Sequence, residues 1–98
     1  MATIAFGEFE WDADKARINL DKHGVSFEEA ASVFLDLDCI VVRDVASPDR
    51  YVAPGFSRLA RMLFVVHVER GESVRLISAR RATRAERVTY EQRKQTPD

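Results

Sequence analysis

The stretch MLFVVHVERGESVRLISA, residues 62–79, decides the fold of this chain. Residues 62–68 are its most apolar run, and in the next run Val74, Leu76 and Ser78 alternate so that they face one side. Gly71 lies between the two runs, where a glycine readily supplies the positive φ of a tight turn. The pattern predicts an antiparallel β-hairpin with its turn over residues 69–73.

Shorter strands are predicted upstream of this hairpin. Apolar and acidic residues alternate over residues 9–12, which is typical of a half-buried strand that extends back toward Ile4. Residues 39–43 form a β-branched run, and residues 50–56 form a weaker candidate strand. Because Pro54 has no N–H to donate, we expect the weaker strand at an edge of the sheet or at a bulge.

Three helices are predicted from the residues at their ends. Asp12 is the predicted N-cap of a helix that ends near Lys22, with Gly24 at the left-handed position after it. The segments Ser26–Glu29 and Thr83–Glu86 both match the capping box, in which a Ser or Thr and a Glu three residues later cap each other. They predict the starts of a second and a third helix.

The predicted order is β-α-α-β-β-β-β-α, with the last helix ending near Gln92. A chain of 98 residues has room for one domain, so we expect residues 1–98 to form a single α+β domain. Consecutive strands joined by short turns predict a small antiparallel sheet packed with about three helices.

The net charge of −1 conceals a division between the two halves of the sequence. Residues 1–49 carry 4 basic and 11 acidic side chains, whereas residues 50–98 carry 11 basic and 5 acidic ones. Ten of those 11 basic residues are Arg, which suits bidentate phosphate contacts. The asymmetry indicates either a face that binds a polyanion or two halves that neutralise each other across a mixed surface.

The composition also excludes two classes of protein. The single cysteine, Cys39, excludes a disulfide scaffold, and no apolar run approaches the roughly 18 residues that a membrane span needs. No basic segment followed by an apolar one is present near residue 1, so no secretory signal is predicted. We therefore expect a soluble cytoplasmic protein without a membrane partner.

The densest group of basic residues surrounds the start of the last predicted helix. Arg80 and Arg81 end a strand just before the N-terminus of this helix, where unsatisfied backbone N–H groups also favour an anion. Arg84 and Arg87 add positive charge to its first turn, at a local cost that a bound anion would offset. The alternative is that these arginines pair with the acidic half and that Glu86 only caps the helix.

The two histidines are weaker signals. Lys22 and His23 end the first helix, where cations complement the helix dipole without any further function. An imidazole beside the Gly24 turn would also suit general acid–base catalysis near neutral pH. His67 lies within the apolar run, and a buried histidine of the sheet is the simpler interpretation. No metal site is predicted, because Cys39 and the histidines lack metal-ligand spacing.

Four segments of the chain resemble the BrnT family. They are FEWD at 9–12, KHGVSFEEA at 22–30, FVV at 64–66 with Glu69-Arg70 after it, and ISARRATRAE at 77–86 with Tyr90 after it. In order and spacing they cover nearly the whole chain, and the blocks at 22–30 and 77–86 are the most specific. Pro54 interrupts a strand that reads in such proteins as a smooth aromatic and isoleucine run.

The resemblance implies a compact fold similar to that of the RelE group and the activity of a ribonuclease toxin from a type II toxin–antitoxin system. It implies neutralisation by a BrnA-like DNA-binding antitoxin, with which the toxin represses its own operon, so that operator DNA is contacted only through the antitoxin. An assembly of two toxins with two antitoxins is expected. The implied reaction uses no metal or cofactor: the RNA 2′-hydroxyl attacks the adjacent phosphate and leaves a 2′,3′-cyclic phosphate and a 5′-hydroxyl.

Within this implied mechanism, roles can be assigned to individual residues. Arg80 and Arg50 are the expected phosphate clamps, and His23, assisted by Lys22, is the expected proton-transfer group, with Glu86 and Tyr90 as alternatives. The expected contacts to the RNA backbone are Arg58, Arg61, Arg81, Arg84 and Arg87. The main alternative is a non-catalytic binding module, whose arginine-rich half docks an acidic partner protein or nucleic acid.

Overall fold

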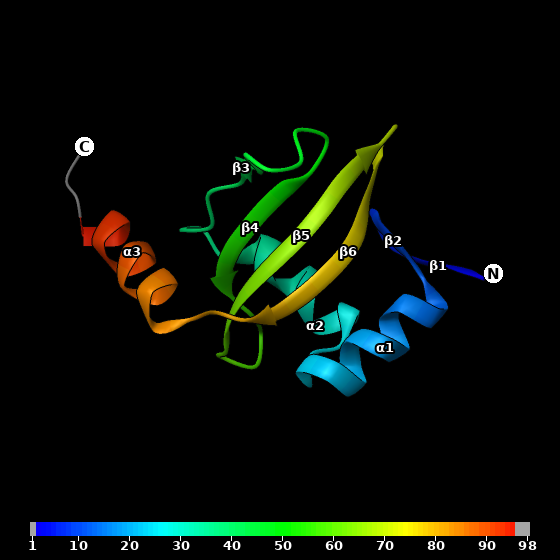
Figure 1. The fold of residues 1–98 in the computed structure, drawn as a ribbon, viewed down its shortest axis with the longest axis horizontal. Helices are drawn as coiled ribbons and strands as arrows, with labels where there is room; N and C mark the ends of the chain where they lie inside the picture. Colours follow the sequence, from blue (N-terminus) through cyan, green and yellow to red (C-terminus); the bar gives the residue numbers. More distant parts are fainter. Residues whose placement is uncertain (1, 96–98) are drawn as a thin grey trace.

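The protein is built on one six-stranded sheet with the strand order β1-β2-β6-β5-β4-β3 (Figure 1). The structure is a computed structural model and describes residues 2–95. The strands are β1 (Thr3–Phe6), β2 (Phe9–Asp12), β3 (Val42–Arg43), β4 (Tyr51–Phe56), β5 (Met62–Arg70) and β6 (Ser73–Arg81). The helices are α1 (Ala13–His23), α2 (Phe27–Ser32), the 3₁₀ turn η1 (Val33–Leu35) and α3 (Arg84–Gln95). The predicted α+β class and the approximate element order are confirmed.

The long hairpin of β5 and β6 forms as predicted, but a bulge changes which residues face the core. Val66 pairs with Ser78, whereas His67 pairs with Leu76, so Ile77 is an extra residue in β6. Leu76 and Ala79 consequently both point into the core, with 1% and 0% of their surface exposed. The expectation that Ser78 shares a face with Leu76 is therefore wrong.

The N-terminal part of the sheet differs from an antiparallel meander. The predicted N-terminal strand is a hairpin of two strands, β1 and β2, and Gly7 adopts a φ of 61° in its turn. β2 then pairs in parallel with β6, through Phe9 with Val74 and Glu10 with Arg75. The sheet is therefore mixed, because the chain crosses from β2 over the helices before it returns to the other strands.

The middle of the chain has less strand structure than its β-branched residues indicate. Of residues 39–43, only Val42 and Arg43 pair, and they pair with Val52 and Tyr51 of β4. Pro54 lies beyond this short contact and pairs with Phe64 of β5. β4 is therefore the edge strand at Pro54, as expected for a residue that cannot donate a ladder hydrogen bond.

All three predicted helix starts are confirmed, but the two capping boxes differ. The Oδ2 of Asp12 accepts from the Lys15 N–H at 3.0 Å, and Gly24 ends α1 with a φ of 68°. At Thr83 the box is reciprocal: the Glu86 N–H donates to Thr83 Oγ1 at 3.2 Å and the Thr83 N–H donates to Glu86 Oε1 at 2.8 Å. At Ser26 only the hydroxyl caps the helix, because the Glu29 carboxylate is used elsewhere.

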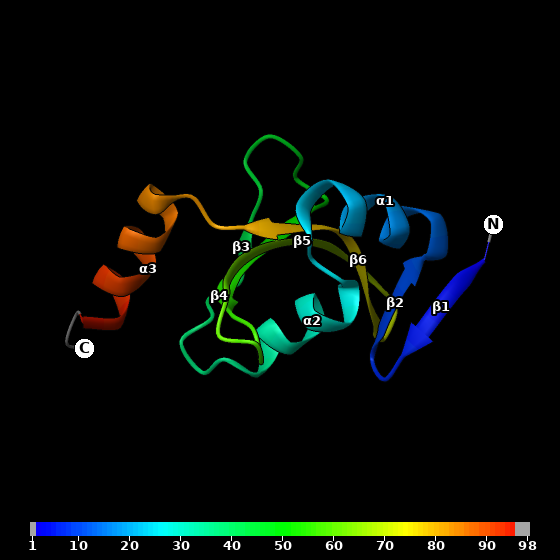
Figure 2. The same ribbon diagram turned by 90° about the horizontal axis from the view of Figure 1, so that it is seen from below.

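The helices surround the sheet unequally. α2 lies in the concave side of the sheet, whereas α3 lies apart beside β4 (Figure 2). The residues packed between α2 and the sheet form the core: Trp11, Val25, Phe27, Ala30, Ala31, Val33, Ala53, Leu63, Val65, Leu76 and Ala79. We call the opposite side, to which Val52, Pro54, Phe64, Ser78 and Arg80 point, the open face of the sheet.

α1 takes the place of a strand along β6. β2 pairs with β6 only near its start, and beyond that point α1 packs beside β6. The Asn19 amide accepts from the Ala79 N–H at 3.1 Å and donates to the Ala79 carbonyl at 2.8 Å, as a neighbouring strand would. Among residues 2–95, no helix combines the length and the apolar character needed to cross a membrane.

Candidate functional site

A bidentate ion pair of Arg80 and Glu86 joins the open face of the sheet to α3. Nη1 and Nη2 of Arg80 donate to Oε1 and Oε2 of Glu86, both at 2.8 Å. The guanidinium also lies 4.6 Å from the centre of the Phe64 ring. Both partners remain accessible, with 40% of the Arg80 side chain and 25% of the Glu86 side chain exposed. The pair therefore holds a guanidinium in a fixed position where a ligand can reach it.

The Glu86 carboxylate has two tasks in this arrangement. It pairs with Arg80, and it caps α3 by accepting from the Thr83 N–H. The hydrogen bonds from Arg80, followed by those from Thr83, outweigh partial burial and lower the pKa of Glu86 below its usual value. Glu86 is therefore ionised at neutral pH, and the pKa of Arg80 is raised by the same contact.

A cavity of about 230 Å³ opens between α3 and the open face, directly beside this pair. Its floor includes Pro54 and Phe64 from the sheet, and its opposite wall comes from small residues of α3, Ala85 and Thr89. Glu86 and Arg93 lie on its border. The walls are mostly apolar, so the arrangement combines a flat apolar surface with a charged rim.

Tyr90 lines this cavity and anchors α3 through its hydroxyl. The hydroxyl donates to Asp36 Oδ2 at 2.5 Å, and the same oxygen accepts from the Phe56 N–H at 2.8 Å. Only 4% of Tyr90 is exposed, and its ring packs edge-on against Phe56. Burial first, and then the Asp36 carboxylate, raise the pKa of Tyr90 well above its usual value. A hydroxyl held in this way is a poor proton donor or acceptor.

Lys22 and His23 line a smaller depression, of about 190 Å³, between α1 and β6. Ser78 and Asn19 also line it. Ser78 and Arg80 are two residues apart on the open face, about 7 Å along the strand. The depression at Lys22 and His23 therefore lies two residues along β6 from Arg80, and neither Lys22 nor His23 lines the cavity beside the Arg80–Glu86 pair.

Arg50 and Arg58 lie away from Arg80. Arg50 directly precedes β4. It lies four residues, or about 13 Å along the strand, from Pro54, and Pro54 is the residue that pairs with Phe64. Arg58 lies in the loop between β4 and β5, where its N–H donates to Ser32 Oγ at 2.8 Å. Its side chain borders a groove beside α2, on the other side of the sheet. The geometry brings neither residue to the Arg80 pair.

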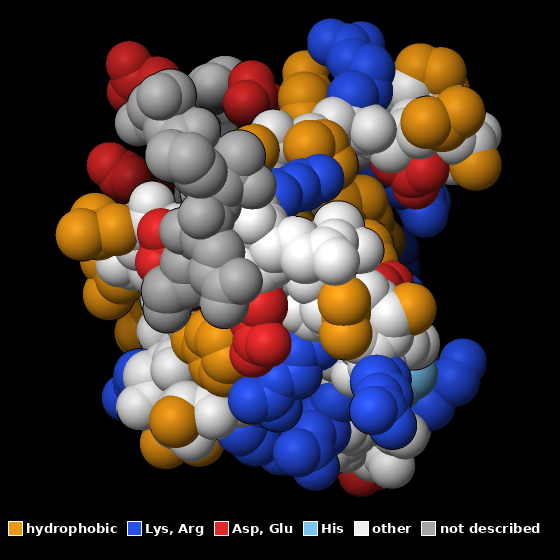
Figure 3. Space-filling view, turned by 90° about the vertical axis from the view of Figure 1, so that its left-hand side faces the viewer, with side chains coloured by type: hydrophobic (Ala, Val, Ile, Leu, Met, Phe, Trp, Pro, Cys, Tyr) orange, Lys and Arg blue, Asp and Glu red, His pale blue; other side chains and the backbone are white. Residues whose placement is uncertain are grey.

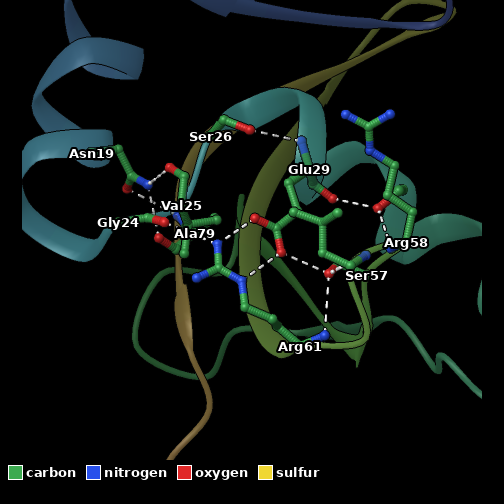
Figure 4. A network of polar contacts seen from close by, with 11 residues as sticks. Asn19, Gly24, Val25, Ser26, Glu29, Ser57, Arg58, Arg61 and Ala79 are labelled. Atoms are coloured by element: carbon green, nitrogen blue, oxygen red, sulfur yellow. Dashed lines mark hydrogen bonds and ion pairs between the residues drawn. The ribbon is translucent and has the colours of Figure 1, made fainter.

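Arg61 belongs to a structural network around the buried Glu29 carboxylate (Figure 4). Its guanidinium pairs with Glu29 through Nε at 2.9 Å and through Nη2, and Nη2 also donates to the Gly24 carbonyl at 2.9 Å. Ser57 Oγ donates to the same Glu29 carboxylate at 2.7 Å. Glu29 is only 2% exposed, and the Arg61 hydrogen bond, against the effect of burial, lowers its pKa. These contacts fix the β4–β5 loop to α2.

Arg81, Arg84 and Arg87 are exposed and surround the start of α3. Figure 3 shows Lys and Arg side chains gathered on the lower part of the side of the molecule that carries α3, with hydrophobic side chains beside them. Arg87 lies 5.6 Å from the centre of the Phe56 ring and contacts Glu91 at 3.3 Å. This distribution suits contacts to a phosphate backbone.

Sequence reasoning did not identify Asp36 as part of the site. Asp36 lies 54 residues before Tyr90, in the loop after η1, and neither periodicity nor a motif connects the two. Only the fold brings the loop and α3 together at Phe56. Within residues 2–95, no group of three or more His, Cys, Asp or Glu side chains is arranged to hold a metal ion.

Comparison with known proteins assigns the chain to a family. Residues 11–86 match the model of the ribonuclease toxin BrnT of type II toxin–antitoxin systems, which is more than half of the chain. The chain belongs to the BrnT family. Its fold is similar to the 1.1 Å crystal structure of the Brucella abortus ribonuclease toxin BrnT, with a TM-score of 0.63 and 26% sequence identity. The similarity covers 76% of this chain and 94% of the Brucella chain.

No curated protein sequence matches this BrnT-family chain. The family match includes Lys22, His23, Arg80 and Glu86, whereas Tyr90 and Arg93 lie beyond it. The Arg80–Glu86 pair is therefore part of the shared region, and most of the helix that borders the cavity is not. The expected resemblance to the BrnT family is confirmed, and the family is one of ribonuclease toxins.

Proposed function

We propose that this BrnT-family toxin is a metal-independent endoribonuclease whose reaction centre is the Arg80–Glu86 pair. The observation that carries the proposal is the accessible guanidinium of Arg80, held by two 2.8 Å hydrogen bonds beside a cavity. RNA cleavage of this type needs a donor for the phosphate oxygens and groups that move two protons. The pair supplies a fixed donor and an ionised carboxylate at one place.

In the proposed reaction the scissile phosphate binds Arg80. The 2′-oxygen forms a bond to phosphorus, and the bond from phosphorus to the 5′-oxygen breaks. As the phosphate takes over a hydrogen bond from Arg80, one oxygen of the adjacent Glu86 carboxylate is released and accepts the proton of the 2′-hydroxyl. His23 donates a proton to the leaving 5′-oxygen from the depression at Ser78 of β6, with Lys22 beside it. The products are a 2′,3′-cyclic phosphate and a 5′-hydroxyl.

The surroundings of the other arginines suggest a different role for each group of them. Arg81, Arg84 and Arg87 bind the RNA backbone, in agreement with their exposure around the start of α3. Arg61 stabilises the fold, since its guanidinium donates hydrogen bonds to the Glu29 carboxylate and the Gly24 carbonyl. Arg50 and Arg58 have no part in the reaction centre, and Tyr90 positions α3.

We also propose the partners that membership of a type II toxin–antitoxin family suggests. A BrnA-like antitoxin binds and neutralises this toxin in a complex of two copies of each, located in the cytoplasm. The complex represses its own operon, and the antitoxin makes the contacts to operator DNA. Co-expression with the neighbouring gene product, followed by determination of the mass of the complex, tests this composition.

The test of the catalytic proposal is cleavage of RNA by the purified chain in excess EDTA, with analysis of the product ends. We expect activity that is unaffected by EDTA and products that carry a 2′,3′-cyclic phosphate. Glu86→Gln and His23→Gln should each lower the rate by about 10²- to 10⁴-fold while the chain stays folded. Loss of cleavage in EDTA, or products with a 3′-hydroxyl, would refute the proposed chemistry.

A further inference from the structure

The cavity between α3 and the open face of the sheet is not needed to form the hydrophobic core. It holds about 230 Å³ of space beside a fold whose core is otherwise formed on the other side of the sheet. Its floor contains the rings of Pro54 and Phe64, and the facing wall of α3 presents the small side chains Ala85 and Thr89. The space is therefore a slot between an apolar floor and one side of α3, which lines it with Ala85, Thr89 and Tyr90 and with the charged residues Glu86 and Arg93.

Charged side chains border this slot at two places, the Arg80–Glu86 pair, of which Glu86 lines the slot, and Arg93. Arg80 holds Glu86 at one end, and its guanidinium covers the Phe64 ring at 4.6 Å. Arg93 lines the slot at the other end, seven residues or about 10 Å further along α3 than Glu86. A ligand that fills the slot would thus have a flat apolar body between two groups that bind anions.

We propose that this slot binds one unstacked nucleobase of the RNA, next to the phosphate held by Arg80. The inference rests on the proposed function, since it assigns the base-binding part of the same site. Bases that leave the stack in single-stranded RNA bind against aromatic rings and guanidinium planes, while arginines hold the flanking phosphates. The floor and the two arginines combine these elements around one space.

The polar groups of the slot indicate how it discriminates between bases. The Tyr90 hydroxyl and the Glu86 carboxylate are both engaged, by Asp36 and by Arg80. The Thr89 hydroxyl donates to the Ala85 carbonyl at 3.1 Å, which leaves its oxygen available as an acceptor. The slot therefore selects by size and stacking, with Thr89 and Arg93 as the groups that read the base edge.

The test compares intact RNA with RNA that lacks the one base, in the wild-type chain and in a variant with a filled slot. Ala85→Trp fills the slot without changing Arg80 or Glu86, and Thr89→Leu fills it from the next turn with a smaller perturbation. Val88→Trp is the matched control, because Val88 is 46% exposed on the same helix and does not line the slot. Binding is measured by fluorescence anisotropy with an oligonucleotide that carries a 2′-O-methyl group at the cleavage position.

We expect Ala85→Trp and Thr89→Leu to weaken binding of intact RNA by about 5- to 100-fold, as for loss of one stacked base. Val88→Trp should bind like the wild type. Removal of the base should weaken binding to the wild type by a similar factor, and the filled variants should then show no further loss.

Equal binding of intact and abasic RNA by the wild-type chain would overturn the inference. So would filled variants that bind intact RNA normally but no longer bind the antitoxin, since the slot would then belong to the protein partner. The assay uses RNA that cannot be cleaved, so its outcome is separate from that of the catalytic proposal. Base-dependent binding without cleavage of ordinary RNA would support the slot and refute the ribonuclease mechanism.

Discussion

Arg61 of the β4–β5 loop and Glu29 of α2, 32 residues apart in sequence, form an ion pair in which the carboxylate is buried and the arginine side chain is 27% exposed. The carboxylate is 2% exposed and also accepts from Ser57 Oγ. The same glutamate stands at the position of a capping box, but its carboxylate contacts Arg61 and not the helix start. This pair explains how a chain with a short α2 holds its loop against the core.

Removal of Arg61 should destabilise the fold strongly. Arg61→Ala leaves the buried Glu29 carboxylate without its charged partner, which should lower the free energy of unfolding by about 3 kcal/mol. Arg61→Lys should recover part of this loss, because it keeps the charge but not the two-nitrogen geometry. Urea denaturation at pH 7 measures both changes. An Arg61→Ala variant of normal stability and reduced RNA binding would show instead that Arg61 is an RNA contact.

The same pair predicts a loss of stability in acid. The Arg61 hydrogen bond holds the pKa of Glu29 below its unfolded value of 4.5. A carboxyl whose pKa is lower in the folded state contributes stability above the unfolded pKa, and this contribution disappears as the pH falls through the folded value. The wild type should therefore lose stability below about pH 4.5 more steeply than Arg61→Ala.

His67 should cause a second pH dependence, closer to neutrality. It is 2% exposed between Phe34 and Tyr51, and neither ring nitrogen has a hydrogen-bond partner within the described residues. Burial lowers the pKa of His67 below 6.5, so the unfolded chain binds a proton that the folded chain excludes. Stability should fall as the pH drops below 6.5, by at most about 1.4 kcal/mol per pH unit.

The control for this prediction is His67→Phe. Phenylalanine keeps the aromatic contacts with Phe34 and Tyr51 and carries no titratable group. The variant should be at least as stable as the wild type at pH 5.5, and its stability should be flat between pH 7.5 and 5.5. An unchanged pH profile in thermal unfolding would contradict the role assigned to His67.

Tyr90→Phe separates an anchoring role from a catalytic one. The Tyr90 hydroxyl donates to the Asp36 carboxylate, and loss of a hydrogen bond to a charged group costs about 1.5–3 kcal/mol. We expect this decrease in the free energy of unfolding, together with RNA cleavage within a few-fold of the wild-type rate at a temperature where the variant is folded. A loss of 10²-fold or more in a fully folded variant would make Tyr90 a proton-transfer group.

Gly55 should not tolerate a side chain. A Cβ atom at this position would lie 2.9 Å from Val33 Cγ1 and 3.1 Å from Asp36 Oδ2. Gly55→Ala should therefore cost about 1–3 kcal/mol in stability, because η1 and the loop after it must move away from β4. The displacement should also disturb the Asp36–Tyr90 contact, which a lower melting temperature and a change in tyrosine fluorescence would report.

Local signals predicted the elements of this fold better than their arrangement. Caps at Asp12, Ser26 and Thr83 identify the helix starts, because a cap depends on residues three or four apart. The parallel pairing of β2 with β6 joins Phe9 to Val74, and no local pattern specifies a contact over that distance. The bulge at Ile77 could not be predicted either, since alternation alone cannot locate an inserted residue.

In the candidate site, too, local features were predicted and contacts between distant segments were not. Arg80 and Glu86 are close in sequence, and the arginine-rich stretch and the capping box both indicated their region. The function of Arg61 could not be read from its charge, because its partner Glu29 belongs to another element. The slot beside Arg80 depends on how α3 lies against β4 and β5, which is a property of packing between distant segments.

The central claim is that Arg80 binds the phosphate that is cleaved. The most direct test is the rate of RNA cleavage in EDTA by the wild type, by Arg80→Ala and by Arg70→Ala, where Arg70 is an exposed arginine at the far end of the same hairpin. We predict a loss of about 10²-fold or more for Arg80→Ala, as for removal of one oxyanion donor, and a near-normal rate for Arg70→Ala. Equal rates for the wild type and a folded Arg80→Ala variant would contradict this account.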